Sequence, residues 1–105
     1  MGETFLRSVE ERFAREHPLR DGDTWKARSF EPGWVEVIPF GRSPYAGGYF
    51  LVREADSAVV RISSNLQVHG ADETRAVIRE IGATASGDTI RSEIQRRTGA
   101  GRDPE

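Results

Sequence analysis

The segment from Gly33 to Ser64 decides the fold. It reads GWVEVIPF (33–40), GRSPYAGG (41–48), YFLVRE (49–54), ADS (55–57) and AVVRISS (58–64). Valine, isoleucine and aromatic residues gather into short runs that are bounded by Gly, Pro, Asp and Ser, a composition typical of β-strands. The segment therefore predicts three consecutive antiparallel strands joined by a longer loop and a short turn.

A helix and a fourth strand are predicted before this segment. Apolar side chains recur at spacings of three and four over residues 4–16, which indicates an amphipathic helix with Thr4 as its cap. Pro18 should end this helix, because proline disfavours helical geometry in the residue before it. In TWKARSF (24–30) apolar and polar residues alternate, so we expect a strand that forms a hairpin with the next one.

A second helix is predicted after the strands, over residues 73–81, with Asp72 as its N-cap and Gly82 at its end. Together these elements predict an α+β fold within residues 1–84. The expected architecture is an antiparallel sheet of about four strands, with an N-terminal helix and the following C-terminal helix packed on it.

The last part of the chain offers little apolar material. Residues 85–98 predict a helix that begins at Asp88, in which only Ile90 and Ile94 form an apolar stripe. We expect this helix to be weakly anchored, and residues 99–105 to be disordered because they have nothing to bury.

The strand pattern also assigns side chains to the two faces of the sheet. In 33–40, one face carries Val35, Val37 and Pro39, and the other carries Trp34, Glu36, Ile38 and Phe40. In the following hairpin, Leu51 with Val60 or Ile62 are candidates for one face, and Phe50, Val52 and Val59 for the other. Apolar residues on both faces predict a central pair of strands that is covered on both sides. Pro39 lacks a donor, so its strand should lie at a local sheet edge or end there.

Composition excludes several classes of protein. A chain of 105 residues is typical of one domain, and without cysteine it can have neither disulfides nor thiolate metal ligands. The N-terminal segment is charged and no long apolar run is present, which argues against a signal peptide or a membrane helix and favours the cytoplasm. The 15 basic and 17 acidic residues are interleaved, so the broad positive field of a nucleic-acid-binding protein is missing.

The residues that could carry catalysis are sparse. His17 and His69 each lack a second ligand at metal-binding spacing, and surface positions explain both. A base formed by His69 with Asp72 is the weaker alternative. The glycines of 41–48 match no phosphate-binding pattern, and they lead into a strand, as in a hairpin loop.

Acidic residues on the strands do not point clearly to a catalytic site either. Glu36, Glu54 and Asp56 fall on a strand or near its turn, where charges are ordinarily solvated. We predict no catalytic residue, no cofactor and no metal site. A small enzyme or ligand-binding domain remains the alternative, with a cavity between helix and sheet that uses Glu36 or His69.

Aromatic residues gather between Trp25 and Phe50, and a domain of this size seldom buries so many completely. Those left outside, together with arginine, have the composition of interface anchors. The candidate partner-binding residues are Trp34, Glu36, Phe40, Arg42, Tyr45 and Tyr49. Stacking of single-stranded nucleic acid on these rings is disfavoured because a basic groove is missing.

The order of elements from Phe5 to Ile81 resembles a known family. An N-terminal helix precedes a strand that begins with Gly33 and Trp34, followed by a strand like YFLVRE, a tight turn, a strand like AVVRISS and a closing helix. In this order the chain resembles the YrhB-type immunity proteins of bacterial polymorphic toxin systems. The resemblance implies a small cytoplasmic binding protein, not an enzyme, that neutralises a cognate toxin through a sheet or loop surface. An accessory subunit of a larger complex is the other binding role considered.

Overall fold

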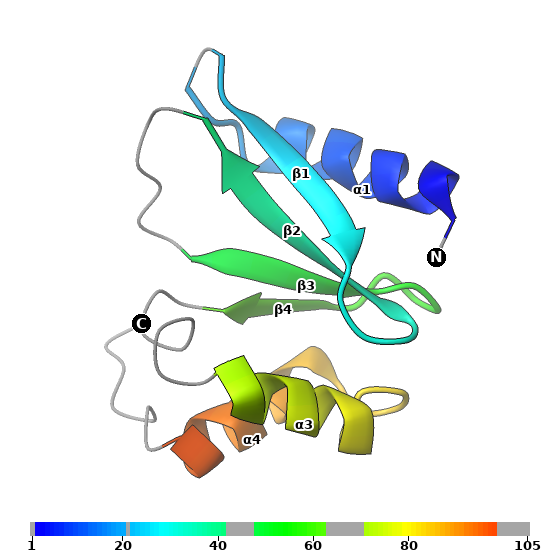
Figure 1. Ribbon diagram of the computed structural model, residues 1–105, viewed down its shortest axis with the longest axis vertical. Helices are drawn as coiled ribbons and strands as arrows, with labels where there is room; N and C mark the ends of the chain where they lie inside the picture. Colours follow the sequence, from blue (N-terminus) through cyan, green and yellow to red (C-terminus); the bar gives the residue numbers. More distant parts are fainter. Residues whose placement is uncertain (1, 21, 42–47, 63–70, 99–105) are drawn as a thin grey trace.

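A computed structural model describes residues 2–20, 22–41, 48–62 and 71–98. The elements are α1 (Glu3–Glu16), β1 (Thr24–Ser29), β2 (Trp34–Phe40), β3 (Tyr49–Arg53), β4 (Val59–Ile62), α3 (Ala71–Ile81) and α4 (Gly87–Thr98). The predicted α+β fold is confirmed, with an N-terminal helix, a four-stranded antiparallel sheet and two C-terminal helices packed on it (Figure 1). The tail expected to be disordered, 99–105, lies outside the described residues.

The strands follow one another in the sheet in the order β1-β2-β3-β4, so each consecutive pair forms an antiparallel hairpin. Pro39 pairs with Trp25 of β1, whereas the pairing of β2 with β3 runs from Trp34 only to Val37. The expectation for Pro39 is therefore confirmed, because the strand lies at a local edge on the side where proline lacks a donor.

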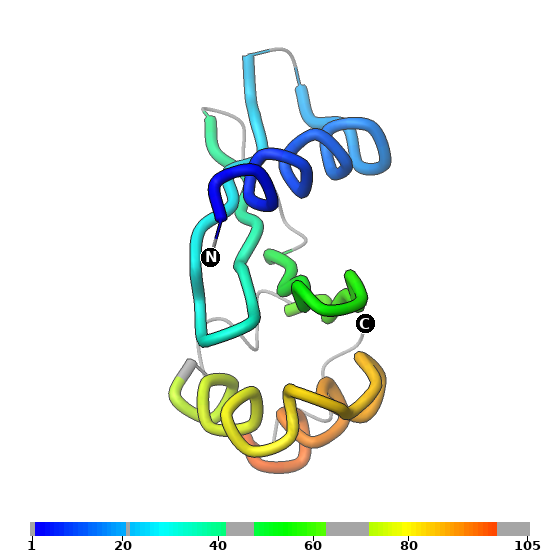
Figure 2. The backbone as a smooth tube through the Cα atoms, turned by 90° about the vertical axis from the view of Figure 1, so that its right-hand side faces the viewer, coloured from blue at the N-terminus to red at the C-terminus, as the bar shows by residue number. Residues whose placement is uncertain are grey.

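The sheet carries one core on each face, as the alternation of apolar residues predicts. The core between α1 and the sheet consists of Val9, Phe13, Trp25, Val35, Val37, Phe50 and Val52. The core between the sheet and the helices α3 and α4 consists of Trp34, Tyr49, Leu51, Val60, Ile62, Val77, Ile78, Ile90 and Ile94. Figure 2 shows the sheet between α1 on one side and the two C-terminal helices on the other. The face assignments of β2, β3 and β4 are thus confirmed.

The helix α4 corrects the expectation of weak anchoring and of a domain that ends at residue 84. Ile90 and Ile94 are both 0% exposed and belong to the same core as Trp34. Arg97 of α4 also donates to Glu80 of α3 at 2.7 and 3.1 Å. Two isoleucines suffice to dock this helix because both point into a core that the sheet and α3 have already formed.

The helix starts differ from the sequence predictions. Gly2, not Thr4, is the N-cap of α1, and it provides no side-chain cap. Asp72 lies inside the first turn of α3, where its charge is favourable to the helix dipole. At α4, Ser86 replaces the expected Asp88 as the cap, since its Oγ accepts a hydrogen bond from the Thr89 N–H at 3.1 Å.

A buried arginine joins the sheet to the C-terminal helices. Arg53 is 6% exposed, and its Nη1 donates to the carbonyl oxygens of Gly82 and Ala85 at 2.8 and 2.7 Å. The Trp34 indole N–H donates to the same Gly82 oxygen at 3.1 Å, and the Arg53 guanidinium lies 5.5 Å from the Trp34 ring centroid. Asp56 accepts from Nε and Nη2 of Arg53, both at 2.9 Å. These contacts fix the end of α3 against β2 and β3.

Candidate functional site: an open strip on the sheet

Part of the sheet face that carries α3 and α4 is not covered by them. The cross-strand pairs of β1 and β2 on this face are Thr24 with Phe40, Lys26 with Ile38, and Arg28 with Glu36. The two helices lie beside β3 and β4, and the first half of β1 with the second half of β2 extends beyond them (Figure 1). We call the uncovered surface the open strip, and define it by Thr24, Lys26, Arg28, Ile38 and Phe40.

Phe40 is the outermost apolar side chain of the open strip. Its exposed fraction is 62%, and across the described ranges it is the one large apolar residue that is exposed. Ile38 beside it is half-buried and packs against the core on the α3 side. The second half of β2 therefore offers an apolar surface to solvent, since none of the described helices covers it there.

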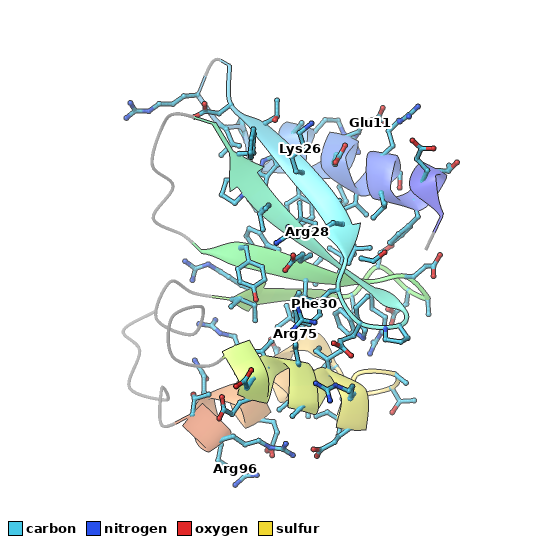
Figure 3. All side chains as sticks on the ribbon, viewed as in Figure 1. Glu11, Lys26, Arg28, Phe30, Arg75 and Arg96 are labelled. Atoms are coloured by element: carbon cyan, nitrogen blue, oxygen red, sulfur yellow. The ribbon has the colours of Figure 1, made fainter. Side chains whose placement is uncertain are left out.

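Two other side chains of the open strip, those of Lys26 and Arg28, are basic. Lys26 is exposed, and the Arg28 side chain is 68% exposed even though its Nε donates to the carboxylate of Glu36. The Glu36 side chain itself is only 11% exposed. Figure 3 shows Lys26 and Arg28 along β1 on the same side of the sheet. The strip thus combines an aromatic ring, an aliphatic side chain and two cations on one continuous face.

The open strip ends where the hairpin between β1 and β2 meets α3. Arg75 of α3 donates to Glu31 at 2.8 Å, and Arg79 contacts the other carboxylate oxygen of Glu31 at 3.3 Å. The Arg75 guanidinium also lies 4.3 Å from the ring centroid of Phe30 (Figure 3). This cluster fixes the hairpin on the helix and leaves the outer part of β1 and β2 open.

The structure separates the predicted partner-binding residues into three groups. Trp34 and Tyr49 are 2% and 8% exposed, so their prediction as partner contacts is wrong: both rings pack in the core under α3 and α4. Phe40 is exposed, and Glu36 reaches the open strip through Arg28. Arg42 and Tyr45 lie outside the described residues.

Tyr49 illustrates how strongly this region is desolvated. Burial raises the pKa of its phenol to about 12, and the negative charge of Glu36 acts in the same direction, while Arg75 and Arg28 oppose it. A phenol in this environment stays neutral at physiological pH, because its charged form would be both buried and close to a carboxylate. Tyr49 therefore acts as a core residue.

The described residues that were considered for catalysis are not brought together. His17 is exposed at the end of α1 and stacks on Phe13, with ring centroids 5.3 Å apart, while His69 lies outside the described residues. Glu54 is exposed and Asp56 binds Arg53, away from Glu36 on β2. Among described residues, no group of three His, Cys, Asp or Glu side chains is placed to hold a metal ion.

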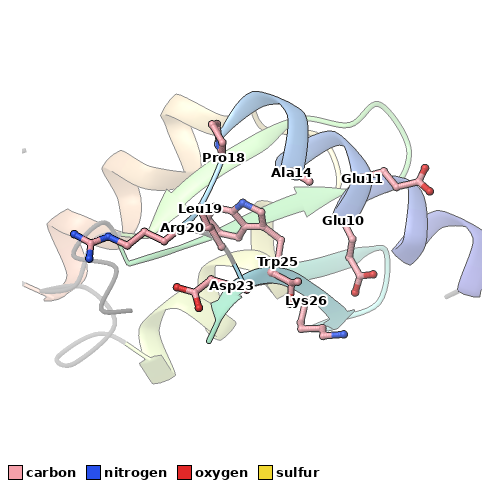
Figure 4. Close-up of a pocket in the computed structure, with 11 residues that line it drawn as sticks. Glu10, Glu11, Ala14, Pro18, Leu19, Arg20, Asp23, Trp25 and Lys26 are labelled. Carbon is pink, nitrogen blue, oxygen red and sulfur yellow. The ribbon is translucent and has the colours of Figure 1, made fainter. Parts of the chain in front are cut away.

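A cleft does lie between a helix and the sheet, although not beside Glu36. It has a volume of about 480 Å³ and separates α1 from the start of β1 (Figure 4). Its lining includes Glu10, Leu19, Asp23, Trp25 and Lys26. The cleft therefore opens at the same strand that forms the outer edge of the open strip.

Lys26 and Arg28 are the site residues that sequence reasoning missed. The alternation in 24–30 already puts both on the polar face of β1, but only the strand pairing shows that this face adjoins Phe40. A positive pair beside an exposed aromatic ring is a feature of the assembled sheet, so neither segment reveals it alone.

Comparison with protein-family models finds no match for this chain. Neither the curated proteins nor the solved structures give a match. Within the described segments, no helix combines the length and the apolar character needed to cross a membrane. The residues of the open strip therefore provide the main physical basis for a functional proposal.

Proposed function

We propose that this chain is a small protein-binding module whose partner surface is the open strip. The observation that carries the proposal is Phe40, which is 62% exposed at the end of a strand and lies on one face with Lys26 and Arg28. An exposed aromatic ring bordered by arginine is the composition found at the energetic centre of protein interfaces. The strands β1 and β2 pair with each other along the whole open strip, so the sheet holds these side chains in a fixed arrangement.

The partner that we propose is a toxin, and the module its immunity protein in the bacterial cytoplasm. Support for this finer proposal comes from the resemblance of residues 5–81 to the YrhB-type immunity proteins. A rigid strip of sheet surface also suits an inhibitor that acts by binding alone, because it needs no catalytic group. The cationic side chains of the strip favour a partner whose contacting surface is acidic.

The first experiment separates the open strip from the rest of the surface. The tagged chain is used to capture proteins from its source cells, in parallel with Phe40→Ala, Lys26→Glu and the control Arg7→Glu. Arg7 is 69% exposed on α1 and, like Arg28, is paired with one glutamate. All three substitutions fall on exposed side chains, so each should change the free energy of unfolding by less than about 0.5 kcal/mol.

We expect wild type and Arg7→Glu to retain one stoichiometric partner. Phe40→Ala and Lys26→Glu should bind it at least about tenfold more weakly, which corresponds to about 1.4 kcal/mol. Equal capture by all four proteins would refute the open strip as the interface.

The immunity role has its own test. The captured partner is expressed in a heterologous bacterium with and without this chain, and growth is measured. Growth arrest that wild type relieves and Phe40→Ala does not relieve is the expected result. A partner that is harmless when expressed alone would exclude the immunity role while leaving the binding module intact.

A further inference from the structure

The strand β1 ends the described sheet, so one of its two edges has no neighbouring strand. The Phe30 N–H donates to the Trp34 carbonyl at 3.1 Å, which fixes the residues of β1 that exchange hydrogen bonds with β2. In an antiparallel pair these residues alternate with residues whose backbone groups point the other way. The N–H and C=O of Ala27 therefore point to the outer edge.

A side chain occupies the outward donor of Ala27. Glu10 of α1 reaches across to β1, and its Oε2 accepts a hydrogen bond from the Ala27 N–H at 2.8 Å. The carboxylate stands where the carbonyl oxygen of an added strand would stand. Glu10 thus protects the edge of the isolated protein against uncontrolled pairing.

Space for one half of an added strand lies beside the first half of β1, at Thr24, Trp25 and Lys26. The cleft of about 480 Å³ between α1 and β1 is within the range of about 300–1,000 Å³ that is usual for binding pockets. Figure 4 shows Glu10, Glu11 and Lys26 around one end of the cleft, and Arg20 and Asp23 around the other. A chain that follows the outer edge of β1 would run along this opening.

The charges of β1 determine which chain fits. Antiparallel pairing of two copies about Ala27 would bring Lys26 of each chain opposite Arg28 of the other, and like charges directly opposite one another are destabilising. A segment with acidic residues at these two positions is favourable for the same reason. The residue between them would face α1, next to the cleft that Trp25 and Ala14 line, and a small side chain there avoids a clash with the helix.

We propose that an extended segment of the partner adds to the outer edge of β1 as a further strand, with an acidic, small, acidic pattern centred on Ala27. Its central carbonyl replaces the Glu10 carboxylate on the Ala27 N–H, and its acidic side chains lie beside Lys26 and Arg28. Addition of a strand to an exposed edge is a common mode of peptide recognition. The inference rests on the proposed protein-binding function and specifies the partner of that site.

The test uses capped synthetic peptides and the full-length, ¹⁵N-labelled chain. The probe alternates glutamate with alanine or valine. One control peptide carries lysine in place of glutamate, and a second is methylated on the backbone nitrogen of its central residue. Binding is followed by NMR through the amide signal of Ala27, and dissociation constants are obtained by titration.

We expect the glutamate peptide to shift the Ala27 amide, and both control peptides to bind at least about tenfold more weakly. Glu10→Ala should bind the probe at least about fivefold more tightly, because the competitor for the Ala27 N–H is gone. Glu11→Ala, which removes a neighbouring charge of the same cleft, should change the dissociation constant less than about twofold. Lys26→Glu should abolish the preference for the glutamate peptide, because Arg28 remains and each peptide then meets one opposite charge and one like charge.

An unchanged Ala27 amide, or a methylated peptide that binds as well as the probe, would overturn the inference. Lys26 is exposed, so the charge reversal remains decisive even if Glu10→Ala fails to fold. Failure here is distinguishable from failure of the proposed function. If Phe40→Ala loses partner capture but the peptides have no effect, the open strip remains the proposed partner surface and only strand addition at β1 is rejected.

Discussion

Replacement of the buried Arg53 by methionine should destabilise the protein strongly, although no partner or ligand is involved. Methionine keeps the unbranched apolar stem but removes the guanidinium. The Gly82 carbonyl retains the Trp34 N–H at 3.1 Å, whereas the Ala85 carbonyl loses its 2.7 Å bond to Nη1. The two bonds to Asp56 are lost as well.

The magnitude follows from the burial of each partner. Hydrogen bonds from a charged donor contribute about 1.5–3 kcal/mol, and those to Gly82 and Ala85 are well shielded because the Arg53 side chain is 8% exposed. The pair with Asp56 adds little, because that side chain is 55% exposed and regains water. We therefore expect Arg53→Met to lower the free energy of unfolding by about 3 kcal/mol, and Tm by more than about 10 °C.

Urea unfolding followed by circular dichroism measures this change, and Arg96→Met is the matched control. Arg96 also donates through two nitrogens to a single carboxylate, that of Glu93, but the Arg96 side chain is 70% exposed. Its loss should change stability by less than about 1 kcal/mol. If Arg53→Met cost no more than Arg96→Met, the proposed role of the buried carbonyl contacts would be wrong.

Two further predictions concern α4 and acid stability. Ile94→Ala should lower the free energy of unfolding by about 2–5 kcal/mol, because Ile94 is 0% exposed. The control Gln95→Ala, at the neighbouring half-buried position, should lower it by less than about 1 kcal/mol in the same urea titration. A small loss of stability in both variants would mean that α4 is only weakly anchored. Hydrogen bonds from Arg53 lower the pKa of Asp56 to about 2, below the value of about 3.9 in an unfolded chain, so the stabilisation is complete above about pH 4 and is lost as the pH falls toward 2. The urea concentration at the unfolding midpoint should therefore fall less between pH 4 and 2 in Asp56→Asn than in wild type. An equal fall of this midpoint in both proteins would contradict the assignment.

Local patterns in the sequence were enough to predict the elements and the faces of the sheet. The period-two alternation in 33–40 separates Val35 and Val37 from Trp34 and Ile38, and the structure places these pairs in the cores on opposite faces. Such a prediction succeeds because strand geometry sends successive side chains to opposite sides regardless of the rest of the fold. Pro18 ends α1 for a similarly local reason.

Contacts between distant residues were decided only by the tertiary structure. Whether an aromatic residue of the sheet is buried depends on the helix that lies over it: α3 and α4 cover Trp34 and Tyr49, but the strands run past them and leave Phe40 in solvent. The bond from Ala27 to Glu10 spans 17 residues, and the one from Arg53 to Ala85 spans 32. The sequence by itself determined which side chains share a face of each element, because this depends on backbone geometry alone. Which faces meet, and therefore which surface is left open for a partner, depends on how the helices pack on the twisted sheet.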